Sequence, residues 1–77
     1  MRRMMLIEKL RNTYELCLQT GENWDEEKII ALLGADEGVS RRTAIDYIRC
    51  AIARFEENKK QKIEMAKRMM VENEHST

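Results

Sequence analysis

The chain has 77 residues, with 14 lysines and arginines balanced by 14 aspartates and glutamates, so its formal net charge is zero. This length suffices for one domain with a marginal core, and neutrality counts against a strong non-specific polyanion binder. The longest apolar runs are far shorter than the ~20 residues that cross a bilayer, and no secretory cleavage pattern follows them. We therefore expect no membrane association and a cytoplasmic protein.

The composition indicates an all-α fold. Proline is absent, only three glycines occur, and helix-favouring residues dominate. Cys17 and Cys50 are expected to be ordinary thiols in a reducing compartment, with a disulfide between them as the alternative. His75 is the only histidine. We therefore expect no metal site, no Cys/His catalytic pair and no cofactor.

The first predicted helix covers residues 1 to 20. Apolar side chains recur there at spacings of three and four, as in an amphipathic helix: Leu6, Ile7, Leu10, Tyr14, Cys17 and Leu18. Gly21 can end this helix in the left-handed conformation. The basic start, Arg2 and Arg3, can contact phosphate or remain in solvent.

The second predicted helix is short, from about Trp24 to Leu33. Asn23 is its expected N-cap, and Glu26, three residues later, completes a capping box. Gly34 is its expected end, and residues 35 to 39 form the predicted turn. We expect Trp24 to hold the first helix against the second.

The third predicted helix begins with Ser40 as its N-cap. Arg41 and Arg42 lie at the positive end of the helix dipole, where acids would stabilise the helix by about 0.3–1 kcal/mol each, so another role for these cations is indicated. At about 100° per residue, an apolar face separates from a polar one. The apolar face carries Ala44, Ile45, Ile48, Ala51, Ile52 and Phe55; the polar face carries Arg42, Asp46, Arg49 and Ala53. That polar face fits either a DNA major groove or plain solvation.

Residues 25 to 52 resemble the helix-turn-helix of transcriptional regulators. The resemblance rests on Ile30-Ala31-Leu32-Leu33-Gly34 and on Gly38-Val39-Ser40-Arg41-Arg42-Thr43-Ala44-Ile45. It implies sequence-specific binding of double-stranded DNA, with Ser40, Arg41, Arg42, Thr43, Asp46 and Arg49 as the contacting positions. The simple motif has alanine where Gly34 stands, so we expect a lengthened connection, as in winged-helix proteins. No wing is expected, because nothing after Ile52 alternates like a strand hairpin.

The charge between residues 22 and 37 restricts such an interaction. Six acids and one lysine give this segment a charge of −5. Like charges repel over a Debye length of about 8–10 Å, so the segment must face away from any bound DNA.

Beyond Phe55 no helix breaker occurs, and the third helix is predicted to continue to about Val71. It would span roughly 48 Å against about 30 Å for a compact chain of this length, so it must overhang its domain. Its apolar face resumes at Ile63, Ala66, Met69 and Met70, which we expect to pair with a second copy, although Lys59 and Lys62 interrupt the stripe. The alternative is a bend near Asn58 that folds the last segment back over the first helix.

The sequence therefore predicts a three-helix helix-turn-helix domain over residues 1–55, with a helical dimerisation extension and a tail, frayed from residue 73, over residues 56–77. The predicted function is a small dimeric transcriptional regulator whose recognition helices enter successive major grooves about 34 Å apart. Arg42 and Arg49 would read bases, and Ser40, Arg41 and Thr43 would grip phosphate. The alternative is a helical protein-interaction module that does not bind DNA. We expect no enzyme activity and no small-molecule substrate, because no catalytic motif is present.

Overall fold

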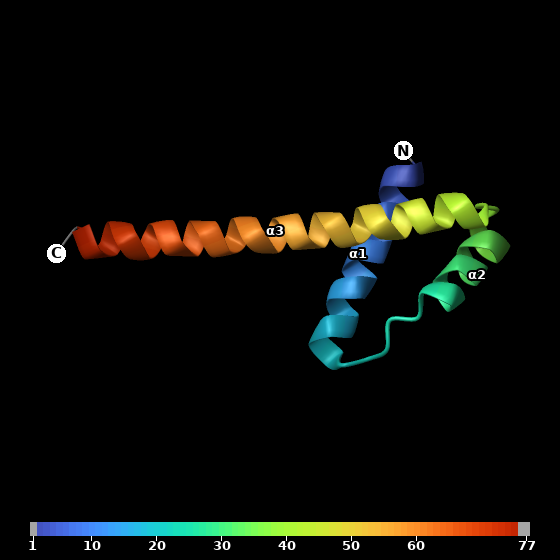
Figure 1. Ribbon diagram of the computed structural model, residues 1–77, viewed down its shortest axis with the longest axis horizontal. Helices are drawn as coiled ribbons and strands as arrows, with labels where there is room; N and C mark the ends of the chain where they lie inside the picture. Colours follow the sequence, from blue (N-terminus) through green and yellow to red (C-terminus); the bar gives the residue numbers. More distant parts are fainter. Residues whose placement is uncertain (1, 76–77) are drawn as a thin grey trace.

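A computed structural model describes residues 2–75, with side chains described for residues 2–70. Within this range the chain forms three α-helices and no strand: α1 (Arg2–Thr20), α2 (Glu26–Glu37) and α3 (Arg41–His75) (Figure 1). The predicted all-α class is confirmed. α1 also ends where the sequence indicated, because Gly21 has a φ of 77° and its N–H donates to the carbonyl of Cys17 at 2.9 Å.

The start of α2 differs from the prediction. Asp25, not Asn23, is the N-cap, and its carboxylate accepts a hydrogen bond from the backbone N–H of Lys28 at 3.3 Å. Trp24 lies in the linker before the helix, where its ring meets that of Tyr14 edge-on at 5.1 Å. The predicted capping box at Asn23 is therefore wrong. Two adequate caps compete within three residues, and the later one leaves Trp24 free of the helix to pack on α1.

The end of α2 also differs. The helix continues through Gly34 to Glu37, and Gly38 ends it with a φ of 65°. The N–H of Val39 then donates to the carbonyl of Leu33 at 3.3 Å. Only residues 38 to 40 connect α2 to α3, so the predicted stop at Gly34 and the lengthened connection are both wrong. A glycine inside a helix costs about 1 kcal/mol relative to alanine, which one further helical turn and a favourable left-handed cap can offset.

These two glycines predict opposite effects of substitution by alanine. Gly34→Ala should raise the free energy of unfolding by roughly 0.5–1 kcal/mol, because its new Cβ would lie 3.6 Å from the carbonyl oxygen of Val39, an ordinary contact. Gly38→Ala should lower it by about 1 kcal/mol, because alanine is strained at positive φ. Urea unfolding of both variants measures the difference, and equal effects would contradict the observed helix end.

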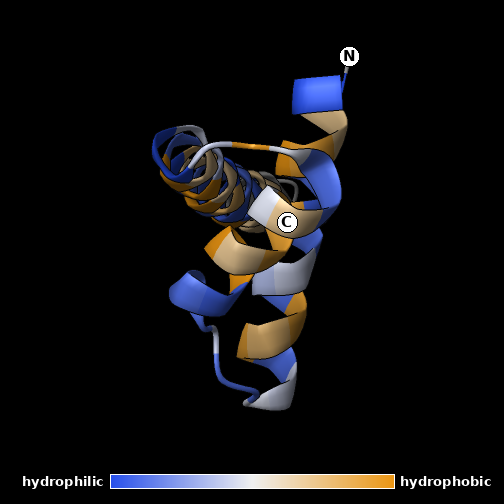
Figure 2. Ribbon diagram, turned by 90° about the vertical axis from the view of Figure 1, so that its right-hand side faces the viewer, coloured by the Kyte–Doolittle hydropathy of each residue, from blue (hydrophilic) through white to orange (hydrophobic). Residues whose placement is uncertain are grey.

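The core lies where α1 crosses the first half of α3. Its buried side chains come from all three helices: Leu6, Ile7, Leu10, Leu33, Ala44, Ile48 and Ala51. Viewed nearly along α3, the charged first turn of α1 extends past this crossing (Figure 2). The predicted apolar face of the third helix is confirmed at Ala44, Ile48 and Ala51, whereas Ile45, Ile52 and Phe55 are half-buried.

α3 is a single unbroken helix of 35 residues, and its second half extends away from the other two helices (Figure 1). The molecule measures 58 Å along its longest axis and 15 Å along its shortest. The predicted overhang is confirmed, and the alternative bend near Asn58 is wrong. The helix continues past Val71 through His75, so residues 73–75 of the tail expected to fray are helical, and residues 76 and 77 lie outside the described range.

Candidate nucleic-acid interface

Ser40 and Thr43 at the start of α3 are bonded to each other. The Ser40 hydroxyl oxygen accepts from the backbone N–H of Thr43 at 3.3 Å and donates to the Thr43 hydroxyl at 3.0 Å. Ser40 is therefore the N-cap that the sequence predicted. These bonds engage its hydroxyl within the chain, so its role in this structure is to begin the helix.

Arg41 joins α3 to α2. Its guanidinium donates to both carboxylate oxygens of Glu27, at 2.8 and 2.9 Å. These hydrogen bonds and the attraction between the charges lower the pKa of Glu27 and raise the pKa of Arg41. Glu27 also supplies the negative charge that the amino end of α3 would otherwise lack. Arg41, although unfavourably placed for the dipole, is thus paired with a residue 14 positions earlier. No local sequence pattern could identify this partner.

The basic start of α1 is likewise paired. The Arg2 Nε donates to the carboxylate of Glu37 at 3.1 Å. Arg3 lies 3.6 Å from the carboxylate of Asp46, and its guanidinium carbon lies 5.8 Å from the ring centroid of Tyr47. Asp46 is therefore at the edge of the polar face of α3, against α1.

Two acids of α2 are paired with basic residues of the other two helices. Glu27 and Glu37 bind Arg41 and Arg2 across the helix interfaces. Attraction between Arg41 and Glu27 at hydrogen-bond distance offsets part of the dipole penalty there. The pairing also removes two cations from those available to an anionic ligand.

Arg42 and Arg49 remain as the accessible cations of this half of α3. Both are exposed, and within residues 2–70 no carboxylate lies within 4.0 Å of either guanidinium. They are seven residues apart, so they share one side of the helix about 10 Å apart along its axis. The exposed Ala53 continues this side, which leaves space for another surface to approach. Of the six predicted contact residues, these two have the geometry of free anion ligands.

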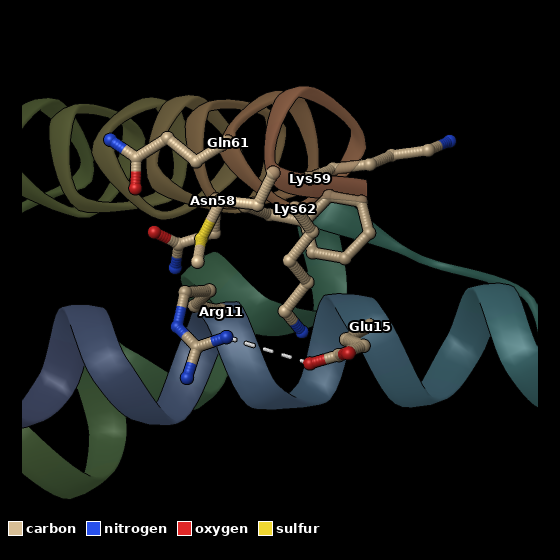
Figure 3. A pocket seen from close by; sticks show the side chains of 8 residues that line it. Arg11, Glu15, Asn58, Lys59, Gln61 and Lys62 are labelled. Atoms are coloured by element: carbon tan, nitrogen blue, oxygen red, sulfur yellow. Dashed lines mark hydrogen bonds and ion pairs between the residues drawn. The ribbon is translucent and has the colours of Figure 1, made fainter. Parts of the chain in front are cut away.

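A groove opens farther along, between α1 and the start of the overhang. It has a volume of about 490 Å³ and is lined by Phe55, Met65 and several polar side chains (Figure 3). On its α1 side, Arg11 donates to Glu8 at 3.1 Å and to Glu15 at 3.5 Å. The pKa of Glu8 is lowered mainly by its hydrogen bond with Arg11, and Glu8 also accepts a hydrogen bond from Arg54.

Comparison with known proteins finds no family model, no curated protein and no solved structure that matches this chain. Both cysteines are free thiols in this structure. No helix in the described part of the chain is long and apolar enough to span a membrane.

Proposed function

We propose that this protein is a small transcriptional regulator that binds double-stranded DNA sequence-specifically, with the first half of α3 in the major groove. The observation that carries the proposal is the accessible pair Arg42 and Arg49 on one side of α3. The major groove admits an α-helix, and arginine is the side chain that most often reads guanine there. The arginines that are paired with carboxylates elsewhere in the domain are not available for this role.

The arrangement of α2 and α3 supports the proposal. A three-residue connection that contains Gly38 joins the two helices, as in a helix-turn-helix. The bidentate pair of Arg41 with Glu27 fixes α2 against the start of α3. We therefore assign Arg41 and Ser40 to positioning the recognition helix rather than to gripping phosphate.

Asp46 gives the proposed surface a means of discrimination. It lies between the two arginines along the helix, and because Arg3 approaches one of its oxygens at 3.6 Å, the other oxygen can accept a hydrogen bond from the amino group of cytosine. A carboxylate there also repels phosphate, which limits non-specific binding by a chain of zero net charge. Thr43, half-buried in the first turn, is close enough to the helix start to approach the DNA backbone.

Fluorescence anisotropy with a randomised 30-base-pair duplex tests the proposal over a salt series. Arg42→Ala/Arg49→Ala should weaken binding about tenfold or more and flatten its salt dependence. The control, Lys9→Ala/Lys28→Ala, removes the same charge from exposed positions on α1 and α2. It should bind nearly as well as the unaltered chain.

Circular dichroism must show that all three proteins are equally helical. No binding by the folded, unaltered chain at low salt would overturn the proposal. An equal loss of binding in the control would show that net charge alone accounts for the interaction.

The protein-interaction alternative is favoured by a different part of α3, its exposed apolar end.

A further inference from the structure

The apolar face of α3 continues beyond the part that α1 and α2 cover. At about 100° per residue, Ala66 lies on the same side of the helix as the buried Ile48, with Ile63, Met69 and Met70 within about 60° of it. Ile63 is 47% exposed, and Met69 and Met70 are 62% and 65% exposed. The face that α1 and α2 cover in the first half is thus open to solvent in the second. A helix without tertiary packing is marginal in water, which favours a partner here.

We propose that a second copy of this chain covers this face, with the two α3 helices antiparallel and overlapping around Ala66. The partner continues an interface that already exists within each chain, because α1 packs on the same side of α3. The orientation of this pair does not depend on DNA binding.

The positions of Lys59 and Lys62 disfavour a parallel pair. Both project on the apolar side of α3, between Phe55 and Ala66, so each would face its own counterpart. Like charges opposed in a helix seam destabilise it. A parallel pair would also bring two copies of α1 to the same end, where both occupy the face to be shared.

An antiparallel pair removes both conflicts. With Ala66 at the two-fold axis, Lys62 lies opposite Met70 of the second copy, and the two α1 helices are at opposite ends. The lysine stems can pack on methionine while their ammonium groups reach solvent. The last turns of each α3 would then lie over the groove between α1 and α3 of the other copy, because residue 75 comes opposite residue 57.

The groove suits the end of a helix. Phe55 and Met65 give it apolar surface, and Lys59 and Lys62 give it positive charge, while Arg11 is paired with Glu15 on its α1 side (Figure 3). The carboxyl end of a helix carries a partial negative charge, which these cations would stabilise. The apolar surface and the charge of the groove therefore fit the last turns of α3 of the second copy, the same chain that would cover the exposed apolar face.

The antiparallel dimer also sets the distance between the two DNA-contacting segments, a consequence that rests on the proposed function. The segment from Arg42 to Arg49 is centred about 20 residues from Ala66, or about 30 Å along the helix. The two copies would place these segments about 60 Å apart, nearer two turns of DNA than one. The arginines lie about 100° to 120° around the helix from the dimer face, so a two-fold axis perpendicular to both helices turns both arginine pairs to one side. This spacing replaces the 34 Å expected from sequence.

Cysteine cross-linking tests the orientation without DNA. In a Cys17→Ser/Cys50→Ser background, one chain carries Lys62→Cys and another Met70→Cys, and the two are mixed under mild oxidation. Mass spectrometry should find the 62-to-70 disulfide between chains and little 62-to-62 or 70-to-70. Predominant like-to-like disulfides would overturn the antiparallel pair.

Sedimentation equilibrium of the unaltered chain tests the partner. A dimer is expected, and Met69→Glu/Met70→Glu should raise its dissociation constant about tenfold or more. Met5→Glu/Leu16→Glu changes two comparably exposed side chains on α1 and should leave it unchanged. A chain that stays monomeric at high micromolar concentration would exclude a second copy as the occupant.

Selection from the randomised duplex pool separates the two proposals. Enriched inverted repeats with centres about 18 base pairs apart would support both. Centres about 10 base pairs apart would retain DNA binding and overturn the antiparallel spacing. A dimer that cross-links as expected but enriches no sequence would overturn sequence-specific DNA binding alone.

Discussion

Replacing Ile48 by alanine is expected to lower the free energy of unfolding by about 3 kcal/mol. Ile48 is 2% exposed and lies in the core formed by all three helices, next to the crossing of α1 and α3. Removal of its branched side chain loses the transfer free energy of the buried groups and leaves a cavity that a rigid helix crossing cannot fill. A domain of this size has a total stability of about 4 to 12 kcal/mol, so the loss is a large fraction of it.

Urea unfolding at fixed protein concentration measures this effect, with the single tryptophan as one probe and circular dichroism as the other. Trp24 packs on Tyr14, which in turn meets Phe55 of α3 at 5.4 Å, so its fluorescence reports the contact between the linker and the core. Leu16→Ala is the control, because Leu16 is 54% exposed. It should change stability by less than about 0.5 kcal/mol. A similar loss in both variants would contradict the assigned core.

Ala51→Leu is expected to destabilise the fold by about 2 kcal/mol for the opposite reason. Ala51 is 0% exposed on the side of α3 that α1 crosses, and a larger side chain there must push the two helices apart. Ala53→Leu makes the same change at an exposed position on the same helix and should alter stability by less than about 0.5 kcal/mol.

The pair is compared by the same urea titration, and each variant is checked for native helicity. If Ala51→Leu were as stable as the unaltered chain, the close approach of α1 and α3 would be wrong. The contact between Arg3 and Asp46, which spans this crossing, would then also be misplaced.

The alternative role as a protein-interaction module differs from the proposed function in which half of α3 acts. The dimer inferred above is itself an interaction through the second half, so the two roles can coexist in one chain. Arg42→Ala/Arg49→Ala should weaken only DNA binding, and Met69→Glu/Met70→Glu should primarily weaken association.

Local patterns in the sequence determined several features of this protein. Apolar spacing of three and four predicted the helices, Gly21 predicted the end of α1, and Ser40 predicted the start of α3. Each depends on residues within a few positions of one another, which is the range over which helix periodicity and capping act. The unbroken length of α3 belongs here too, because it follows from an absence of breakers after Phe55.

Only the tertiary structure decided the rest. Asp25 replaced Asn23 as the cap where Trp24 packs on α1, and α2 passed Gly34 to end at Gly38. Arg41 found Glu27, and Arg3 found Asp46, across separations that no local pattern encodes. Those pairings left Arg42 and Arg49 as the unpaired cations among the six predicted contact residues. The physical reason is that charge pairing and competition between caps depend on which segments the core brings together, and this is known only once the helices have packed.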